Sequence, residues 1–141
     1  MGKAFAVTPL LLLPVLAYNL LAMTLGGLTS PDVNAGLTAA LFETPTASGG
    51  RWPVSLADLL LAAALVILFV ELIKPTWDRQ SAMINHIASI TLFVVCLVEM
   101  LALAACATST FFLITLMVLL DVLAGFILGA ATRRPEPKAR R

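Results

Sequence analysis

Residues 59–70 read LLLAAALVILFV, an unbroken run of apolar side chains that decides the fold class. A soluble amphipathic helix keeps a polar face opposite its apolar stripe, and this segment has none. It lies within the apolar run 54–73, and similar runs cover 4–28, 82–107 and 110–131. Each run reaches the roughly 20 residues with which a helix crosses ~30 Å of hydrocarbon. The sequence therefore predicts an all-α membrane protein, a four-transmembrane-helix bundle whose first partner is the lipid bilayer.

The composition agrees with a membrane location, since 60% of the residues are hydrophobic and 12% are charged. We expect one transmembrane domain over 1–132, followed by a basic, disordered cytoplasmic tail over 133–141. A signal peptide is the alternative for the run 4–28. That run is long for the 7–15 apolar residues of a signal peptide, and no clear small-x-small cleavage site follows it. We therefore interpret it as the first span.

The basic residues indicate how the chain is oriented. Arg51 alone falls on the outer side of the four-span topology. The other eight of the nine basic residues fall together on the opposite side: Lys3, Lys74, Arg79, Arg133, Arg134, Lys138, Arg140 and Arg141. Lys and Arg in short loops stay in the cytoplasm, so we expect both termini there, and the inner membrane as the location in a bacterium. Trp52 and Trp77 flank the second span at opposite ends, where tryptophan anchors a helix at the headgroup level.

The first outer connection, 29–53, carries the signals of a helix start. Ser30 is suited to the N-cap and Pro31 to the first helical position. Val33 and Leu37 then share one face. The pattern predicts a short interfacial helix over 31–43, followed by a flexible loop. A connection of this length often has a function, and a plain linker is equally compatible with it.

Three polar residues interrupt the spans well inside the membrane. Counted from the outer ends at 1.5 Å per residue, Asn19 lies ~13 Å deep, Glu99 ~12 Å and Asp121 ~16 Å. Carboxyl groups at such depths usually face the interior of a bundle. The sequence thus predicts one buried polar layer in which Glu99 approaches Asp121. The two acids can serve as hydrogen-bonding contacts between helices, load protons or a cation, or pair with a basic residue of another protein.

Two further pairs suggest contacts between helices. Glu71 and His86 fall at similar depths near the cytoplasmic end, so a contact between them is geometrically reasonable. Gly125 and Gly129 have the Gly-x-x-x-Gly spacing that lets membrane helices approach closely. We interpret these glycines as a helix-packing face. Glu71 also has Lys74 three residues later, which favours a local ion pair.

No motif of an enzyme occurs in the chain, such as a GxSxG elbow, a phosphate-binding glycine loop or HExxH. Two Cys and one His do not complete a structural zinc set, and no cofactor or nucleic-acid site is expected. We expect a non-enzymatic accessory or structural subunit that packs with other membrane subunits or with copies of itself. The alternative is a small proton- or cation-coupled transporter that uses Glu99 and Asp121.

Overall fold

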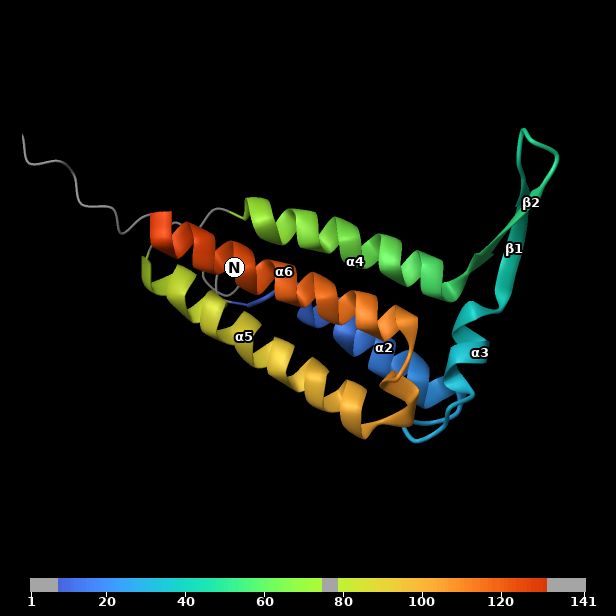
Figure 1. Ribbon diagram of the computed structural model, residues 1–141, viewed down its shortest axis with the longest axis horizontal. Helices are drawn as coiled ribbons and strands as arrows, with labels where there is room; N and C mark the ends of the chain where they lie inside the picture. Colours follow the sequence, from blue (N-terminus) through green and yellow to red (C-terminus); the bar gives the residue numbers. More distant parts are fainter. Residues whose placement is uncertain (1–7, 75–78, 132–141) are drawn as a thin grey trace, which may run out of the picture.

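The computed structural model of this chain describes residues 8–74 and 79–131, which form an elongated helical bundle with a small hairpin at one end (Figure 1). The long helices are α2 (Leu12–Leu25), α4 (Leu56–Ile73), α5 (Arg79–Ala102) and α6 (Ser109–Ala131). The shorter elements are helix α3 (Val33–Thr38), strands β1 (Ala40–Pro45) and β2 (Arg51–Ser55), and the 3₁₀ helix η1 (Ala104–Cys106).

Three helices in the described part of the chain are long and apolar enough to cross a membrane: Leu56–Ile73, Ala82–Ala102 within α5, and Ser109–Ile127 within α6. Their outward surfaces carry many exposed large apolar side chains, as expected where the solvent is lipid. The prediction of a mostly helical chain with apolar helices of membrane-spanning length is confirmed at this level. Helix α2 is also apolar but has 14 residues, which span only ~21 Å.

Helix α2 begins later than the apolar run 4–28 suggests, at Leu12. Pro14 therefore lies in the first turn, where its missing N–H costs no helical hydrogen bond. In a helix that began at residue 4, Pro14 would lie in the interior and would kink the helix. Because α2 begins at Leu12, Pro14 fits into the helix without breaking a hydrogen bond. The preceding residues 8–10 lie outside the helix, and Thr8 O and Leu10 N–H bond to side chains of other segments.

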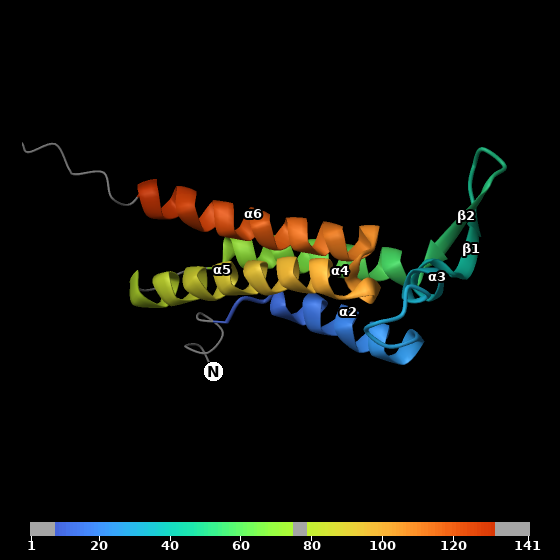
Figure 2. The same cartoon turned by 60° about the horizontal axis from the view of Figure 1, so that its bottom comes forward.

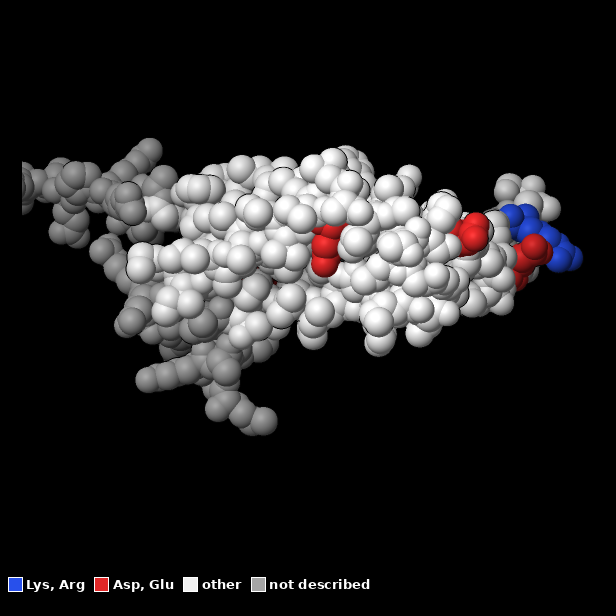
Figure 3. Space-filling model, turned by 90° about the horizontal axis from the view of Figure 1, so that it is seen from below, with Lys and Arg blue, Asp and Glu red and all other residues white. Residues whose placement is uncertain are grey.

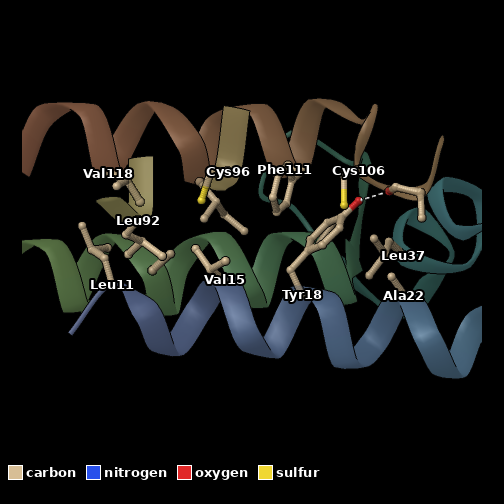
Figure 4. Close-up of a cluster of buried hydrophobic side chains, with 14 of the residues drawn as sticks. Leu11, Val15, Tyr18, Ala22, Leu37, Leu92, Cys96, Cys106, Phe111 and Val118 are labelled. Atoms are coloured by element: carbon tan, nitrogen blue, oxygen red, sulfur yellow. Dashed lines mark hydrogen bonds between the residues drawn. The ribbon is translucent and has the colours of Figure 1, made fainter. Parts of the chain in front are cut away.

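The four long helices alternate in direction along the chain and pack around a common core, so that α2 runs parallel to α5 and α4 runs parallel to α6 (Figure 1). Figure 1 shows α6 between α4 and α5, and the rotated view in Figure 2 shows α2 on the opposite side of the bundle from α6. Tyr18 extends from α2 into the core and its ring lies 4.8 Å from that of Phe111 on α6 (Figure 4). The buried cluster also includes Leu11, Val15, Ala64, Leu68, Leu92, Cys96, Ile114 and Val118.

Helix α4 starts at a capping box that is visible in the sequence. The Ser55 hydroxyl accepts from the backbone N–H of Asp58, and the Asp58 carboxylate accepts from the backbone N–H of Ser55 at 2.9 Å. These bonds satisfy donors that the first helical turn leaves without partners. Because Ser55 is also the last residue of β2, the hairpin passes into α4 without a loop.

The outer connection does not form the interfacial helix predicted over 31–43, and that prediction is wrong beyond Thr38. Helix α3 covers only Val33–Thr38, and β1 and β2 then pair as an antiparallel hairpin. The buried Val33 and Leu37 hold the short helix to the bundle, whereas Leu41 is exposed. The segment expected to be a flexible loop closes this hairpin, with Gly49 at φ 83° in the turn, a conformation that glycine adopts readily.

Helix α5 ends at Ala102, earlier than the run 82–107 predicts, and the chain continues as η1. The backbone N–H of Ala105 donates to Leu28 O at 3.2 Å, so this connection is tied to the segment that follows α2. The end of α5 at Ala102 places Glu99 in the last turn of that helix.

Two predictions lie outside the described residues: the basic tail 133–141 and the anchor Trp77. The other anchor, Trp52, lies on β2 and is exposed.

Candidate functional site

A buried ion pair closes one end of the bundle. Lys74 Nζ lies 3.2 Å from Glu71 Oε1, and the two side chains are only 2% and 1% exposed. Asn85 of α5 donates to Glu71 Oε1 at 2.9 Å and its Oδ1 accepts from Lys74 Nζ at 3.2 Å. The non-helical start of the chain completes the group, since Leu10 N–H donates to Glu71 Oε2 and Lys74 Nζ donates to Thr8 O. We call Glu71, Lys74 and Asn85 with these two backbone groups the Lys74 cluster.

The Lys74 cluster contains the ion pair expected from the i, i+3 spacing, but more deeply buried than a lysine assigned to a loop suggests. Glu71 meets Asn85 where His86 was expected. Asn85 and His86 are neighbours in the sequence, so the sequence gave no reason to prefer either one as the partner of Glu71. The rotation of α5 about its axis decides which of the two side chains faces α4.

Asp121 lies on α6 and is 8% exposed. Its Oδ2 accepts a hydrogen bond of 2.6 Å from the hydroxyl of Ser89 on α5. It also lies within electrostatic range of Glu71, Lys74 and His86. Asp121 therefore belongs to the half of the bundle that holds the Lys74 cluster. Ser89, itself fully buried, is the partner that the sequence did not identify.

His86 packs across the α5–α6 interface onto Gly125 and Phe126. Its ring meets that of Phe126 edge-on, with centroids 4.6 Å apart. A Cβ atom added at Gly125 would overlap His86 Nδ1 and would lie 2.9 Å from Cε1. Gly125 thus lets the His86 ring lie close to the backbone of α6. The Gly-x-x-x-Gly spacing had instead suggested the close approach of a second helix backbone. Among the described residues, a Cβ added at Gly129 meets nothing within 4 Å, so the two glycines have different surroundings.

The second polar contact joins α2 to α5 towards the other end. Asn19 Nδ2 lies 3.2 Å from Glu99 Oε1 and 3.1 Å from Oε2. Cys106 Sγ approaches Asn19 Oδ1 at 3.7 Å. Nearby, the Tyr18 hydroxyl donates to Ala105 O at 2.7 Å (dashed in Figure 4) and lies 2.6 Å from the hydroxyl of Thr108. The sequence placed Asn19 and Glu99 in one polar layer, and the structure shows that these two side chains bond directly to each other.

Glu99 and Asp121 do not share a layer. Helices α5 and α6 are antiparallel, so a residue further along α5 lies opposite a residue earlier in α6. Ser89 lies opposite Asp121, and Glu99, ten residues after Ser89, therefore lies near the level of Phe111, ten residues before Asp121. Glu99 lies three residues before the end of α5, ~5 Å along the axis, whereas Asp121 lies twelve residues after the start of α6, ~18 Å along it. The depth of Glu99 predicted from the sequence was too large, because that prediction continued the third helix over 103–107.

Glu99 also differs from Asp121 in exposure. Glu71 and Asp121 are buried, whereas Glu99 is only partly buried between the core stripe of α5 and the exposed residues Val95 and Ala102. Figure 3 shows one acidic patch midway along this face and a second one closer to the charged right-hand end, on a surface that is otherwise mostly uncharged. Within the described residues, the ion pairs join Arg51 to Glu43 and Lys74 to Glu71, and Glu99 takes part in neither.

The described residues contain no group of three or more His, Cys, Asp or Glu side chains that could hold a metal ion. Cys96 and Cys106 are buried free thiols. The site is therefore a set of hydrogen-bonded contacts between helices, closed at the Lys74 cluster and partly open at Asn19 and Glu99. No protein family, curated protein or solved structure matches the chain.

Proposed function

We propose that this chain is a small polytopic membrane protein that acts as a non-enzymatic subunit of a larger membrane assembly. In this proposal α4, α5 and α6 cross the bilayer, and α2 together with the residues before it forms a fourth crossing. Both termini then lie on one side, which the excess of basic residues assigns to the cytoplasm. The neighbouring subunit binds at the side of the bundle where Asn19 and Glu99 meet.

The partial exposure of Glu99 is the observation that carries this proposal. A carboxyl group in a membrane is costly unless polar groups surround it. Asn19 can donate to either carboxyl oxygen, but it covers the group from one side only. A Lys, Arg or hydroxyl side chain from another membrane helix fits the remaining side, and the exposed apolar residues around Glu99 give such a helix a surface to pack on.

The test is site-specific crosslinking in the native membrane. A photoreactive amino acid replaces Val95, which is exposed one helical turn from Glu99, and in a second variant it replaces Phe69, which is exposed on α4 across the bundle. We expect the Val95 probe to crosslink one defined membrane protein, and the Phe69 probe to give that product at least about tenfold less. Addition of Glu99→Gln should lower the Val95 product, because a neutral amide loses the attraction to a cationic partner.

Equal crosslinking from both positions, or a Val95 product that Glu99→Gln leaves unchanged, would contradict the proposal. A product of twice the mass of the chain identifies a second copy as the neighbour, which retains the subunit role and changes only the partner.

A small proton-coupled transporter is the second candidate, favoured by Asp121. Ionisable residues inside membrane proteins often mark proton or ion paths, and Asp121 lies within electrostatic range of Glu71, Lys74 and His86. The separation of Glu99 from Asp121 removes the paired-carboxylate site and confines such a path to one half of the bundle. The saturated hydrogen bonding of the Lys74 cluster makes this candidate the weaker one.

Proteoliposomes with an internal pH indicator separate the two candidates. A transporter predicts proton entry driven by an imposed gradient, lost in Asp121→Asn and retained in Glu99→Gln. A subunit predicts the same slow leak in the wild type, in both variants and in empty vesicles.

A further inference from the structure

The hairpin of β1 and β2 has one apolar and one polar face. The register pairs Phe42 with Val54 and Thr44 with Trp52. Because paired residues share a face and faces alternate along a strand, these four side chains lie together; we call this the Phe42–Trp52 face. The opposite face carries Glu43, Pro45, Arg51 and Pro53. Glu43 and Arg51 form an exposed ion pair of 3.0 Å there.

The Phe42–Trp52 face is covered at its base and uncovered further out. Val54 is 7% exposed, so this face turns towards the protein where the hairpin joins the bundle, whereas Phe42 and Trp52 are 53% and 59% exposed. A two-stranded hairpin is marginally stable alone in water. An apolar covering of these two rings would therefore stabilise it.

The position of the hairpin indicates what that covering is. Since Ser55 ends β2 and Leu56 begins α4, the base of the hairpin lies where the hydrophobic length of α4 ends. The hairpin then projects sideways from the end of the bundle (Figures 1 and 2). The headgroup layer beyond the hydrocarbon is roughly 5–8 Å thick on each side, and tryptophan is enriched at that level.

We propose that the hairpin lies in the lipid headgroup layer, with Phe42 and Trp52 inserted towards the acyl chains and the Glu43–Arg51 pair facing water. A protein partner fits this face less well. Two aromatic side chains bury at most about 300–500 Å² together, whereas a stable protein interface buries about 800 Å² on each partner. A lipid surface has no minimum area of this kind.

Fluorescence quenching by brominated phospholipids tests this placement in the full-length chain. The chain has two tryptophans, so Trp77→Phe leaves Trp52 as the single probe. We expect bromine near the headgroup to quench Trp52 at least about threefold more than bromine near the end of the acyl chains. In the Trp52→Phe/Trp77→Phe background, Pro45→Trp places the probe on the opposite face, where lipid quenching should be weak and aqueous iodide should quench strongly.

A third probe, Leu65→Trp in the same background, lies near the middle of α4 and should respond most to the deep bromine. Its response verifies insertion of the bundle independently of the hairpin. With that response present, equal lipid quenching of the Trp52 and Pro45→Trp probes overturns the proposal. Shielding of Trp52 from iodide without quenching by lipid also overturns it, because protein would then cover this face.

Discussion

The Lys74 cluster and the Asn19–Glu99 pair are both polar contacts inside an apolar bundle, but only the first is closed. Glu71 and Lys74 carry opposite charges, and Asn85 and two backbone groups complete their hydrogen bonds. Glu99 has one amide partner and remains partly exposed. A closed cluster holds helices together, whereas a partly covered carboxyl group leaves room for a group from outside. Substitutions in the Lys74 cluster should therefore lower the stability of the bundle, whereas substitution of Glu99 should mainly weaken contact with a neighbouring protein.

The largest loss of stability should follow Lys74→Met. This change leaves Glu71 buried without its cation, which typically costs about 3–5 kcal/mol. Unfolding by a denaturing detergent, followed by circular dichroism in mild micelles, measures the change. The double variant Glu71→Gln/Lys74→Met should recover most of the loss, because no uncompensated charge remains. A single variant as stable as the wild type would show that the cluster is not closed.

The next largest effect should come from Gly125→Ala. The added methyl group overlaps the His86 ring, and overpacking of this kind costs about 1–3 kcal/mol. Gly129→Ala is the matched control and should change the stability by less than about 0.5 kcal/mol. If His86 is the cause, then His86→Ala in the Gly125→Ala background should cost less than His86→Ala alone. If the losses of stability from Gly125→Ala and His86→Ala simply add in the double variant, then the methyl group at position 125 does not act through His86.

Ser89→Ala should cost about 1–2 kcal/mol, because Asp121 loses the hydroxyl donor that lies 2.6 Å from its carboxylate. Thr91→Ala is a suitable control on the same helix, since Thr91 is exposed and bonds only to the backbone one turn earlier. The same unfolding assay applies. Equal effects of the two variants would mean that the Ser89–Asp121 bond adds nothing specific.

Glu99→Gln should have the smallest effect on stability, below about 0.6 kcal/mol, because its amide oxygen can still accept from Asn19. Its effect should appear instead in the crosslinking yield at Val95. A loss of stability as large as that of Lys74→Met would erase the distinction between the closed and the open region.

Several features of the fold could be predicted because they depend on local sequence. The apolar run 59–70 lacks a polar face in any rotation, so it predicted a membrane helix without knowledge of its neighbours. Ser55 and Asp58 predicted the start of α4, since a capping box needs only residues within one turn. The similar depth of Asn19 and Glu99 could also be predicted, because each lies at a similar distance from the same end of its apolar run, but their direct contact was not predicted.

Other features depend on residues far apart in the chain. The hairpin was missed because Ala40–Pro45 becomes a strand only through pairing with Arg51–Ser55. The burial of Lys74 depends on acceptors supplied by Thr8 and Asn85. The separation of Glu99 from Asp121 depends on where α5 ends, and the apolar sequence 100–107 did not mark that end.

The sequence by itself determined the long apolar helices and the polar residues that interrupt them, and from these it predicted a lipid solvent, since hydrophobicity and helix length are properties of single segments. Only the tertiary structure decided which polar residues meet. Register and helix rotation are set by packing between segments, and a shift of a few residues moves a side chain from one partner to another. For this protein that shift placed Asp121 beside Ser89, enclosed Lys74, and left Glu99 partly exposed.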